Sequence, residues 1–252
     1  MNLDALFTLF SGLPRLGPGS DRSTLDALRR LPPLPPNPAI LDLGCGTGRQ
    51  TLVLARELRA RVTAIDIHQP CLDALARNAA EAGLSDFIQT RCLSMDALDY
   101  PPESIDLIWC EGAIFVLGVA EALRLWRPPL RSGGHLVFSE CTWLDAEPPA
   151  EPAAFFAEEY PAMTTLDGNH RHAASAGFEI LDAFPLPVED WWTDFYTPLR
   201  ARIAKLRPEL PAQPELAAVV TATEREIDLF SRFSSSYGYV FYLLRKPLTA
   251  VP

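Results

Sequence analysis

The chain has 252 residues, of which 48% are hydrophobic and 21% charged, and its formal net charge is −10. A field of this sign repels the phosphate backbone of nucleic acids and the head groups of anionic lipids, so the composition disfavours both as partners. The length is enough for one complete α/β domain with additions and is short for two independent domains.

The cysteines and the apolar segments bear on where the protein works. Five cysteines are present without a C-x-x-C pair, which predicts reduced thiols and neither a disulfide framework nor a zinc site. No stretch approaches the ~18 consecutive apolar residues of a membrane span, and the N-terminus lacks the features of a signal peptide. We therefore expect a soluble, cytoplasmic protein that has no membrane partner and binds no metal.

Glycine and proline dominate the start of the chain. Residues 3–10 form a short amphipathic pattern, residues 11–20 are too rich in glycine and proline for regular structure, and a helix is expected over residues 24–31. Ser20 or Asp21 is in position to cap that helix. The segment is either a disordered leader or, as we expect, a loop that folds over a ligand and excludes water.

A glycine-rich turn follows the first predicted strand. Residues 39–43 form a short apolar run typical of a strand covered on both faces. Gly44, Gly46 and Gly48 then allow a sharp turn and a close approach to a ligand, because no Cβ is in the way. The helix expected over residues 50–58 would point its free N–H groups at that ligand.

The next predicted strand, residues 61–66, ends in a carboxylate. Asp66 lies at about the 20-residue spacing from the turn at which an acid accepts the hydroxyls of a ribose. In the nicotinamide-binding pattern G-x-G-x-x-G the third glycine would come one residue later than Gly48, so this turn departs from the pattern typical of nicotinamide dehydrogenases.

Strands and helices alternate through the rest of the chain. We expect strands over residues 87–92, 104–110, 135–140, 177–184 and 237–245, helices over residues 69–82 and 119–126, and a turn at residues 131–134. This alternation predicts βαβ units and a parallel sheet, whose ligands bind outside the carboxyl ends of the strands. Two stretches, 141–176 and 190–233, break the pattern and are expected to be helical insertions.

The residues from Asp42 to Gly48, D-L-G-C-G-T-G, fit the motif D-x-G-C-G-x-G at every position, and the chain resembles the class I S-adenosylmethionine-dependent methyltransferases. This resemblance implies a Rossmann-like α/β fold with a seven-stranded, mostly parallel sheet, an antiparallel final strand, and helices on both faces. It also implies a single domain over 1–252, with an N-terminal cap region at 1–31 and both insertions over the acceptor site. The cofactor would be S-adenosylmethionine and its product S-adenosylhomocysteine.

Three further pieces of sequence look like a bacterial subfamily of small methyltransferases with largely unassigned acceptors. They are S-G-L-P-R near the start, W-C-E-G-A-I after the fourth strand, and W-W-T-D-F-Y-T-P-L late in the chain. The similarity implies methyl transfer to an O, N or S atom of a small molecule by a monomer or homodimer. Two alternatives remain open: a methyltransferase for protein or nucleic acid, and a non-catalytic protein that binds S-adenosylmethionine or S-adenosylhomocysteine.

Most of the cofactor contacts implied by the resemblance lie at the glycine turn and the strand ends. They are Asp42, Gly44, Cys45, Gly46, Thr47, Gly48, Gln50, Thr51, Asp66, Ile67, Ser94, Met95 and Cys110. Asp66 would bind the ribose and Ile67 would lie against adenine, whereas a strand-end acid that caps the next helix is the alternative role for Asp66. Ser94 stands where relatives have an acid, and Asp96 is the alternative there.

Glu111, directly after the fourth strand, is the candidate catalytic base or the group that grips a cationic acceptor. It would otherwise hold a backbone N–H or the amino group of the methyl donor. Aromatic side chains with a polar end suit a pocket for a small organic molecule. The nominated acceptor-binding residues are Glu140, Trp143, Tyr160, Trp191, Trp192 and Tyr196. About half of these are expected to pack the insertions onto the sheet instead.

Overall fold

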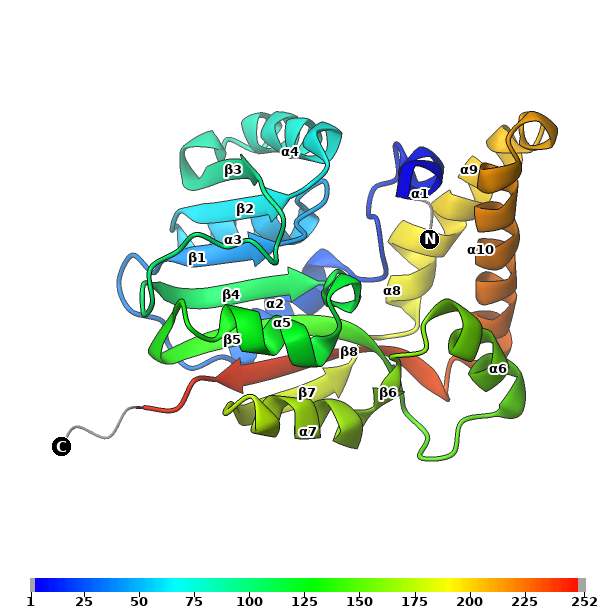
Figure 1. Cartoon of the computed structure of the whole chain (residues 1–252). Coiled ribbons are helices and arrows are strands. Elements are labelled where there is room, and N and C mark those ends of the chain that lie inside the picture. The colour runs from blue at the N-terminus through cyan, green and yellow to red at the C-terminus, as the bar shows by residue number, and fades with distance from the viewer. Residues whose placement is uncertain (1–2, 249–252) are drawn as a thin grey trace.

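The core of the molecule is one eight-stranded sheet, shown in Figure 1 for the computed structural model, which describes residues 3–248. Its strands are β1 (Ile40–Leu43), β2 (Val62–Asp66), β3 (Ile88–Cys92), β4 (Ile105–Glu111), β5 (Leu130–Trp143), β6 (Thr164–Thr165), β7 (Glu179–Pro185) and β8 (Tyr237–Arg245). The order is β3-β2-β1-β4-β5-β8-β7, and β6 pairs with the end of β5. Strand β8 runs antiparallel to both of its neighbours, β5 and β7, which confirms the predicted antiparallel final strand.

The helices divide into those that cover the sheet and those beyond its carboxyl edge. The first group is α2 (Asp21–Arg30), α3 (Arg49–Leu58), α4 (Gln69–Glu81), α5 (Val119–Trp126) and α7 (Leu166–Ser175), with the short turns η1 (Ser85–Phe87) and η2 (Ile114–Val116). The second is α1 (Leu3–Phe10), α6 (Ala150–Glu159), α8 (Glu189–Trp191), the π-helical turn η3 (Trp192–Tyr196), α9 (Thr197–Leu206), η4 (Leu210–Ala212) and α10 (Pro214–Phe233).

Alternate residues of the buried strands point to opposite faces of the sheet. Trp109 of β4 packs with Ala27 of α2 and Leu54 of α3 on one face. On the other face, Ile108 packs with Trp126 of α5. Because both faces are covered there, the central strands β1 and β4 are buried along nearly their whole length, as the sequence predicts for residues 39–43.

The second group of helices forms a cap over the carboxyl ends of the parallel strands (Figure 1). In this cap, α1 packs against α9 and α10, so the start of the chain joins segments from its last third. Its apolar core includes Leu9, Phe156, Phe195 and Phe230. Ligands of open α/β sheets bind at this edge, so the cap encloses the expected site.

Three details differ from the sequence prediction. The sheet has an eighth strand, because the two residues of β6 pair with Thr142 and Trp143 at the end of β5. The predicted turn at residues 131–134 lies inside β5. Helix α7 packs against α5 and β7, so the 141–176 segment gives the cap only α6 and its flanking loops.

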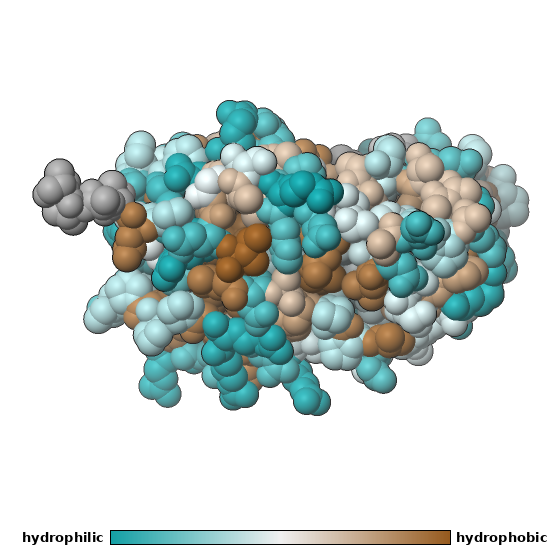
Figure 2. All heavy atoms as spheres, turned by 90° about the horizontal axis from the view of Figure 1, so that it is seen from below, coloured by the Kyte–Doolittle hydropathy of each residue, from teal (hydrophilic) through white to brown (hydrophobic). Residues whose placement is uncertain are grey.

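The face seen from below carries apolar side chains interrupted by polar ones (Figure 2). Charged residues protect the edge strand β7: Asp182 pairs with Arg30 at 2.7 Å, and Glu179 pairs with Arg245. Such charges discourage pairing with another strand.

Within residues 3–248, no helix combines the length and apolar character of a membrane span. The same residues contain no group of three or more His, Cys, Asp or Glu that could hold a metal ion.

Candidate active site

The glycine turn between β1 and α3 adopts a backbone that other residues rarely reach. Gly44, Gly46 and Gly48 have φ angles of +66°, +53° and +82°. A Cβ at Gly44 would lie 2.4 Å from the Cβ of Ala113, and one at Gly48 would lie 2.1 Å from Cδ1 of Leu75. The turn is therefore wedged between the end of β4 and α4, and two of its glycines are required by both conformation and space.

Asp66, at the end of β2, is held against this turn. Its Oδ2 accepts a hydrogen bond of 2.8 Å from the N–H of Gly46, and its Oδ1 accepts one of 2.9 Å from the N–H of His68. Each oxygen keeps a lone pair for another donor, such as a hydroxyl group. The turn and the acid, which the sequence predicted to act together, are thus in direct contact.

Apolar side chains lie on either side of this pair. Ile67, the residue after Asp66, is 52% exposed and offers an uncovered aliphatic surface. The Cε of Met95 approaches to 3.6 Å from the position of a Cβ on Gly44. Ser94, in the loop after β3, is partly buried, whereas Asp96 is exposed.

A cavity of about 1180 Å³ borders the turn. Leu16 of the N-terminal loop and Thr47 of the turn both line it, as does His68 at the start of α4. The ring of Phe7 from α1 stacks on His68 with 3.7 Å between centroids. The N-terminal segment therefore stands over the turn, where the sequence prediction placed it.

Asp42 supports the turn from inside the protein. The carboxylate accepts hydrogen bonds from Thr51 Oγ1 at 2.5 Å and from Gln50 Nε2 at 3.3 Å, and Gln50 also donates to the carbonyl of Cys45. Burial raises the pKa of Asp42 to about 7. Because these side chains are buried, they act by shaping the turn more than by touching a ligand.

Two cysteines named as cofactor contacts have buried thiols. The side chain of Cys110 is 0% exposed in the core under α5, and Cys45 is 2% exposed. Burial raises the pKa of both thiols well above the ordinary value. Because both thiols are buried, any contact of these residues with a ligand would be made by their backbone groups, and their assignment as cofactor contacts stays a prediction.

Glu111, the predicted catalytic residue, is more constrained than the sequence indicated. Its Oε1 accepts hydrogen bonds of 2.8 Å from both Thr24 Oγ1 and Trp109 Nε1. Its Oε2 lies 3.6 Å from Nη1 of Arg15. Burial raises the pKa of Glu111 in spite of Arg15 and the two donors. Only Oε2 is open to another partner, and base catalysis by this residue stays a prediction.

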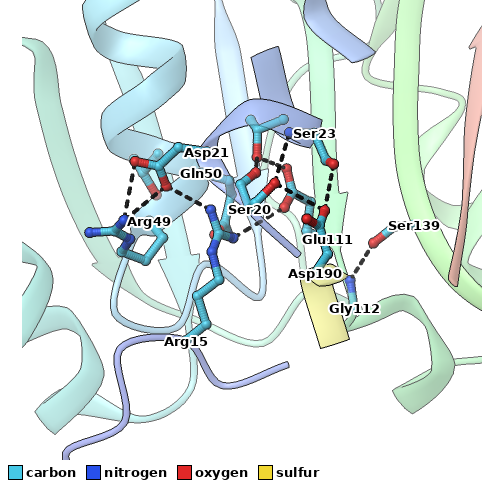
Figure 3. Close-up of polar contacts among 12 residues, drawn as sticks. Arg15, Ser20, Asp21, Ser23, Arg49, Gln50, Glu111, Gly112, Ser139 and Asp190 are labelled. Carbon is cyan, nitrogen blue, oxygen red and sulfur yellow. Dashed lines mark hydrogen bonds and ion pairs between the residues drawn. The ribbon is translucent and has the colours of Figure 1, made fainter. Parts of the chain in front are cut away.

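Arg15 was missed by the sequence reasoning. It comes from the N-terminal loop, and its Nη2 donates to Asp21 Oδ1 at 2.8 Å, while Arg49 pairs with the same carboxylate at 3.1 Å (Figure 3). Its Nε is buried and has no hydrogen-bond partner among residues 3–248. The motif S-G-L-P-R, noted only for its family likeness, was the available signal.

A second anchor ties the N-terminal loop to the cap. Asp190 of α8 accepts hydrogen bonds on Oδ2 from the hydroxyls of Ser20 and Ser23, and its carbonyl accepts one of 3.1 Å from Gly19 (Figure 3). The Ser20 hydroxyl also accepts from the N–H of Ser23 and caps α2, as predicted. The second half of the loop is therefore held at two points, at Arg15 and at Gly19 with Ser20.

Glu140, near the end of β5, lies in the predicted acceptor region. It is 3% exposed, and its Oε1 accepts a hydrogen bond of 2.9 Å from the N–H of Cys141. Tyr160 also hydrogen-bonds to this carboxyl, and burial raises the pKa of Glu140 to about 8. The Tyr160 ring meets the edge of Phe115, in the turn after β4, at a centroid distance of 6.0 Å.

The nominated aromatic residues separate into two groups. Trp143, Trp191 and Tyr196 are 8%, 3% and 0% exposed and pack in the cap core, so little of their surface is left for an acceptor. Trp192 is partly buried, with the guanidinium of Arg200 5.0 Å from its ring centre. The prediction that about half of the set would pack the insertions agrees with this division.

Tyr239 of β8 is a further residue that the sequence reasoning missed. A Cβ at Gly112 would lie 3.0 Å from Cε2 of Tyr239, so its ring occupies the space beside the end of β4. The ring of Trp191 stands edge-on to it at 5.1 Å. Pairing of β8 with β5 brings Tyr239 here, and a strand pattern alone cannot indicate that neighbour.

Comparison with known proteins agrees with this geometry. Residues 40–134 match the family model of a methyltransferase domain. The chain is 26% identical over 231 residues to 27-O-demethylrifamycin SV methyltransferase of Amycolatopsis mediterranei, covering 88% of this chain and 82% of that protein. It is 33% identical over 126 residues to dimethylglycine N-methyltransferase of Parasynechococcus marenigrum, covering 48% and 44%.

Solved structures share the fold. The [4+2]-cyclase SpnF superposes with a TM-score of 0.77 at 22% identity, covering 98% of this chain and 93% of that one. A sarcosine dimethylglycine methyltransferase from Galdieria sulphuraria gives 0.70 at 18% identity, covering 90% and 85%. The glycine turn, the strand-end acid and the match over residues 40–134 together support a class I S-adenosylmethionine-dependent methyltransferase.

Proposed function

We propose that this protein transfers a methyl group from S-adenosylmethionine to an O, N or S atom of a small molecule. The observation that carries the proposal is the hydrogen bond from Gly46 to Asp66, which sets a ligand-approachable backbone and a carboxylate side by side. When bound, S-adenosylmethionine supplies an electrophilic methyl group on its sulfonium. The acceptor's lone pair would form the new bond as the methyl–sulfur bond breaks, S-adenosylhomocysteine would be released, and the proton of an O–H, N–H or S–H acceptor would pass to solvent.

The residues around the turn fit an adenosine. Asp66 keeps lone pairs free for the two hydroxyls of the ribose, and Ile67 offers 52% of its surface to an apolar ring. The N-terminal loop, with Leu16 over Gly46, would cover the bound cofactor and exclude water. These features support the cofactor contacts inferred from the motif.

The acceptor class is inferred from the relatives and from the cap. The related proteins named for their reactions act on a rifamycin, on dimethylglycine and on a phytyl hydroquinone, all of them small molecules. The cap formed by α1, α6, α8, η3, α9, η4 and α10 lies over the strand ends in this chain. Such enclosure suits a small acceptor better than a macromolecule, and the net charge of −10 further disfavours nucleic acid.

Glu140 and Tyr160 are the polar groups that we assign to the acceptor pocket. With its pKa raised to about 8, the carboxyl of Glu140 is largely protonated at pH 7 and can donate a hydrogen bond to an acceptor oxygen. The neighbouring Phe115 and Tyr160 rings supply an apolar wall. An acceptor with one polar atom on an otherwise apolar body fits this combination.

Two measurements test the proposal. Calorimetry is expected to show binding of S-adenosylmethionine and S-adenosylhomocysteine; tight binding of NAD with no response to either would contradict it. A panel of amines, phenols, thiols and carboxylates, scored by release of S-adenosylhomocysteine, then identifies the acceptor. Cofactor binding without turnover across a broad panel would favour a non-catalytic binding protein instead.

A further inference from the structure

The cavity beside the glycine turn extends away from the expected adenosine position. From the turn it takes Thr47, whereas Gly44, Gly46, Asp66 and Ile67 are not among its lining residues. Its volume of about 1180 Å³ is larger than the roughly 300–1,000 Å³ of most small-molecule sites. The cavity therefore has room for a ligand other than the cofactor.

One face of α3 and one face of α4 form a wall of this cavity. Arg49, Leu52 and Arg56 line it from α3, at the i, i+3 and i+7 spacing of a single helix face. From α4 the lining includes Ala74 and Arg77, which also share a face. Helix α1 and the N-terminal loop form the opposite wall, so the space separates α1 from α4 (Figure 1).

The cavity is positively charged within a protein whose net charge is −10. Its cationic side chains come from α3, α4 and α9 and are Arg49, Arg56, Arg77 and Arg202. The acids in the lining are Asp4 and Glu81, so two positive charges are in excess. Because a concave site concentrates the field of its walls and distant charges are screened, this excess attracts anions locally.

Two of these arginines are engaged at one nitrogen and unsatisfied at another. Nη2 of Arg49 pairs with Asp21 at 3.1 Å, and Nη2 of Arg202 donates to the carbonyl of Thr8 at 3.1 Å. The Nε atom of each arginine is buried and has no hydrogen-bond partner within residues 3–248. Buried donors without an acceptor are uncommon in folded proteins, and a bound ion or molecule is one of the ordinary explanations.

The lining also contains apolar side chains. Phe7 and Leu16 face the cavity from the N-terminal segment, and Pro70 does so from the start of α4. The Phe7 ring is fixed by its stack on His68, at 3.7 Å between centroids. A ligand that is anionic at one end and apolar at the other matches this combination.

We propose that this cavity binds a small organic molecule that carries a phosphate group. Guanidinium groups bind phosphate oxygens through paired hydrogen bonds, and the several oxygens of one phosphate can be shared among arginines from different helices. The phosphate would lie on the arginines of α3 and α4, and the apolar part against Phe7 and Leu16.

The cavity and the expected cofactor position share one neighbour. Leu16 lines the cavity, and its Cδ1 would be 3.2 Å from a Cβ on Gly46 of the turn. A molecule in the cavity would therefore contact the loop that covers the cofactor in the proposed function. Because coupling between two ligands is reciprocal, a molecule that favours the closed loop should also tighten cofactor binding. This coupling rests on the proposed function, whereas the phosphate site does not.

Calorimetry with phenyl phosphate tests the site, since this probe joins a phosphate to an apolar ring. It should bind more tightly than inorganic phosphate, which lacks the ring, and phenol should not bind measurably. Arg56→Gln and Arg77→Gln should each weaken phenyl phosphate by about tenfold, through loss of a charge-assisted hydrogen bond. Both positions are exposed and glutamine is a good helix former, so the variants should fold as the wild type does.

Arg171→Gln is the matched control, because Arg171 is an exposed arginine of α7, a helix that does not line the cavity. It changes the net charge by the same amount and should leave the affinity unchanged. Ala74→Phe fills the cavity without changing the charge and should prevent binding. Ala76→Phe places the same ring about 200° further round α4, at an exposed position, and should bind as wild type does.

A titration of phenyl phosphate into protein saturated with S-adenosylhomocysteine separates the two sites. Phenyl phosphate should bind at least as tightly there as to the free protein. Competition between the two ligands would show that the cavity belongs to the cofactor site and would overturn the inference. If the protein fails to bind S-adenosylhomocysteine, the proposed function fails, and the titrations without that ligand still decide the phosphate site.

Three further results would contradict the proposal. If the wild type does not bind phenyl phosphate, the cavity is not a phosphate site. If Arg171→Gln weakens binding as much as Arg56→Gln does, only the overall charge of the protein is at work. If inorganic phosphate binds as tightly as phenyl phosphate, the site takes the free ion and not an organic molecule.

Discussion

The backbone N–H of Gly46 donates a hydrogen bond of 2.8 Å to Oδ2 of Asp66, across 20 residues of sequence. This bond joins the turn after β1 to the tip of β2, and it is possible because the two strands are parallel neighbours in register from Ile40 with Val62. A ligand bound on the turn would therefore also lie next to the carboxylate of Asp66. Several consequences can be measured.

Replacement of Asp66 by alanine should weaken every adenosine ligand to a similar extent. The change removes the acceptor for Gly46 and His68 as well as the expected ribose contact. We expect the dissociation constants of S-adenosylhomocysteine and 5′-methylthioadenosine to rise together by at least about tenfold. Asp73→Ala, which removes an exposed acid of α4 bonded to Gln69, is the control for calorimetry. Equal affinities in Asp66→Ala and wild type would remove Asp66 from the site.

Gly48→Ala should destabilise the protein through both backbone and packing. The new methyl group would lie 2.1 Å from Cδ1 of Leu75 at a φ of +82°. The left-handed backbone costs about 1–2 kcal/mol and overpacking about 1–3 kcal/mol, so we expect a loss of about 2–5 kcal/mol in urea unfolding.

Gly83→Ala separates these two effects, because its φ is +67° and nothing lies within 4 Å of its Cβ position. Only the backbone cost of about 1–2 kcal/mol should appear there. Equal losses in the two variants would show that contact with Leu75 does not matter.

Local patterns predicted much of the fold. The bounds of α5 and β8 agree with the sequence prediction because periodicity and flanking glycine or proline mark those segments. The turn expected at residues 131–134 lies instead inside β5, because these residues form hydrogen bonds with Lys246, which is distant in the sequence. The carbonyl of Gly134 accepts from Lys246, and Gly133 donates back to it, so the end of β8 extends the strand.

The candidate site likewise contains contacts that local sequence patterns predict and contacts that they do not. Asp42, the glycines and Asp66 lie within one βαβ unit, so their spacing predicts their contact. Asp190 and Ser23 are 167 residues apart, and Arg15 meets Glu111 only after the N-terminal loop folds back over β4. Contacts of this length depend on tertiary packing, for which a single sequence has no local signal.

The stability of the protein should depend on pH through Glu140. Its pKa is raised by burial from 4.5 to about 8, so the folded state binds the proton more tightly than the unfolded chain does. The stabilisation from this proton is complete below pH 4.5 and is lost as the pH rises towards 8. Glu140→Gln removes it, so wild type should lose up to roughly 1.4 kcal/mol per pH unit relative to the variant over this range.

Urea unfolding of both proteins at pH 5.5, 6.5, 7.5 and 8.5 measures this difference. Taking the difference between the two proteins cancels the contribution of Asp42, whose pKa of about 7 acts in the same direction. Parallel curves for wild type and Glu140→Gln would mean that Glu140 is ionised in the folded protein at all these pH values.

Asp190→Ala should release the N-terminal loop from the cap. The change removes the acceptor of the Ser20 and Ser23 hydroxyls and costs about 1–3 kcal/mol at this buried position. Trypsin cleaves after arginine, and Arg15 is buried in the folded protein. We therefore expect faster cleavage after Arg15 in the variant, measured by mass spectrometry of the fragments.

Glu189→Ala, at the exposed neighbouring position, should be cleaved at the wild-type rate. S-adenosylhomocysteine should slow cleavage of wild type, because ligand binding favours the closed loop. If Asp190→Ala is as resistant as wild type, the loop is held by its other contacts, and the two serines serve only to cap α2.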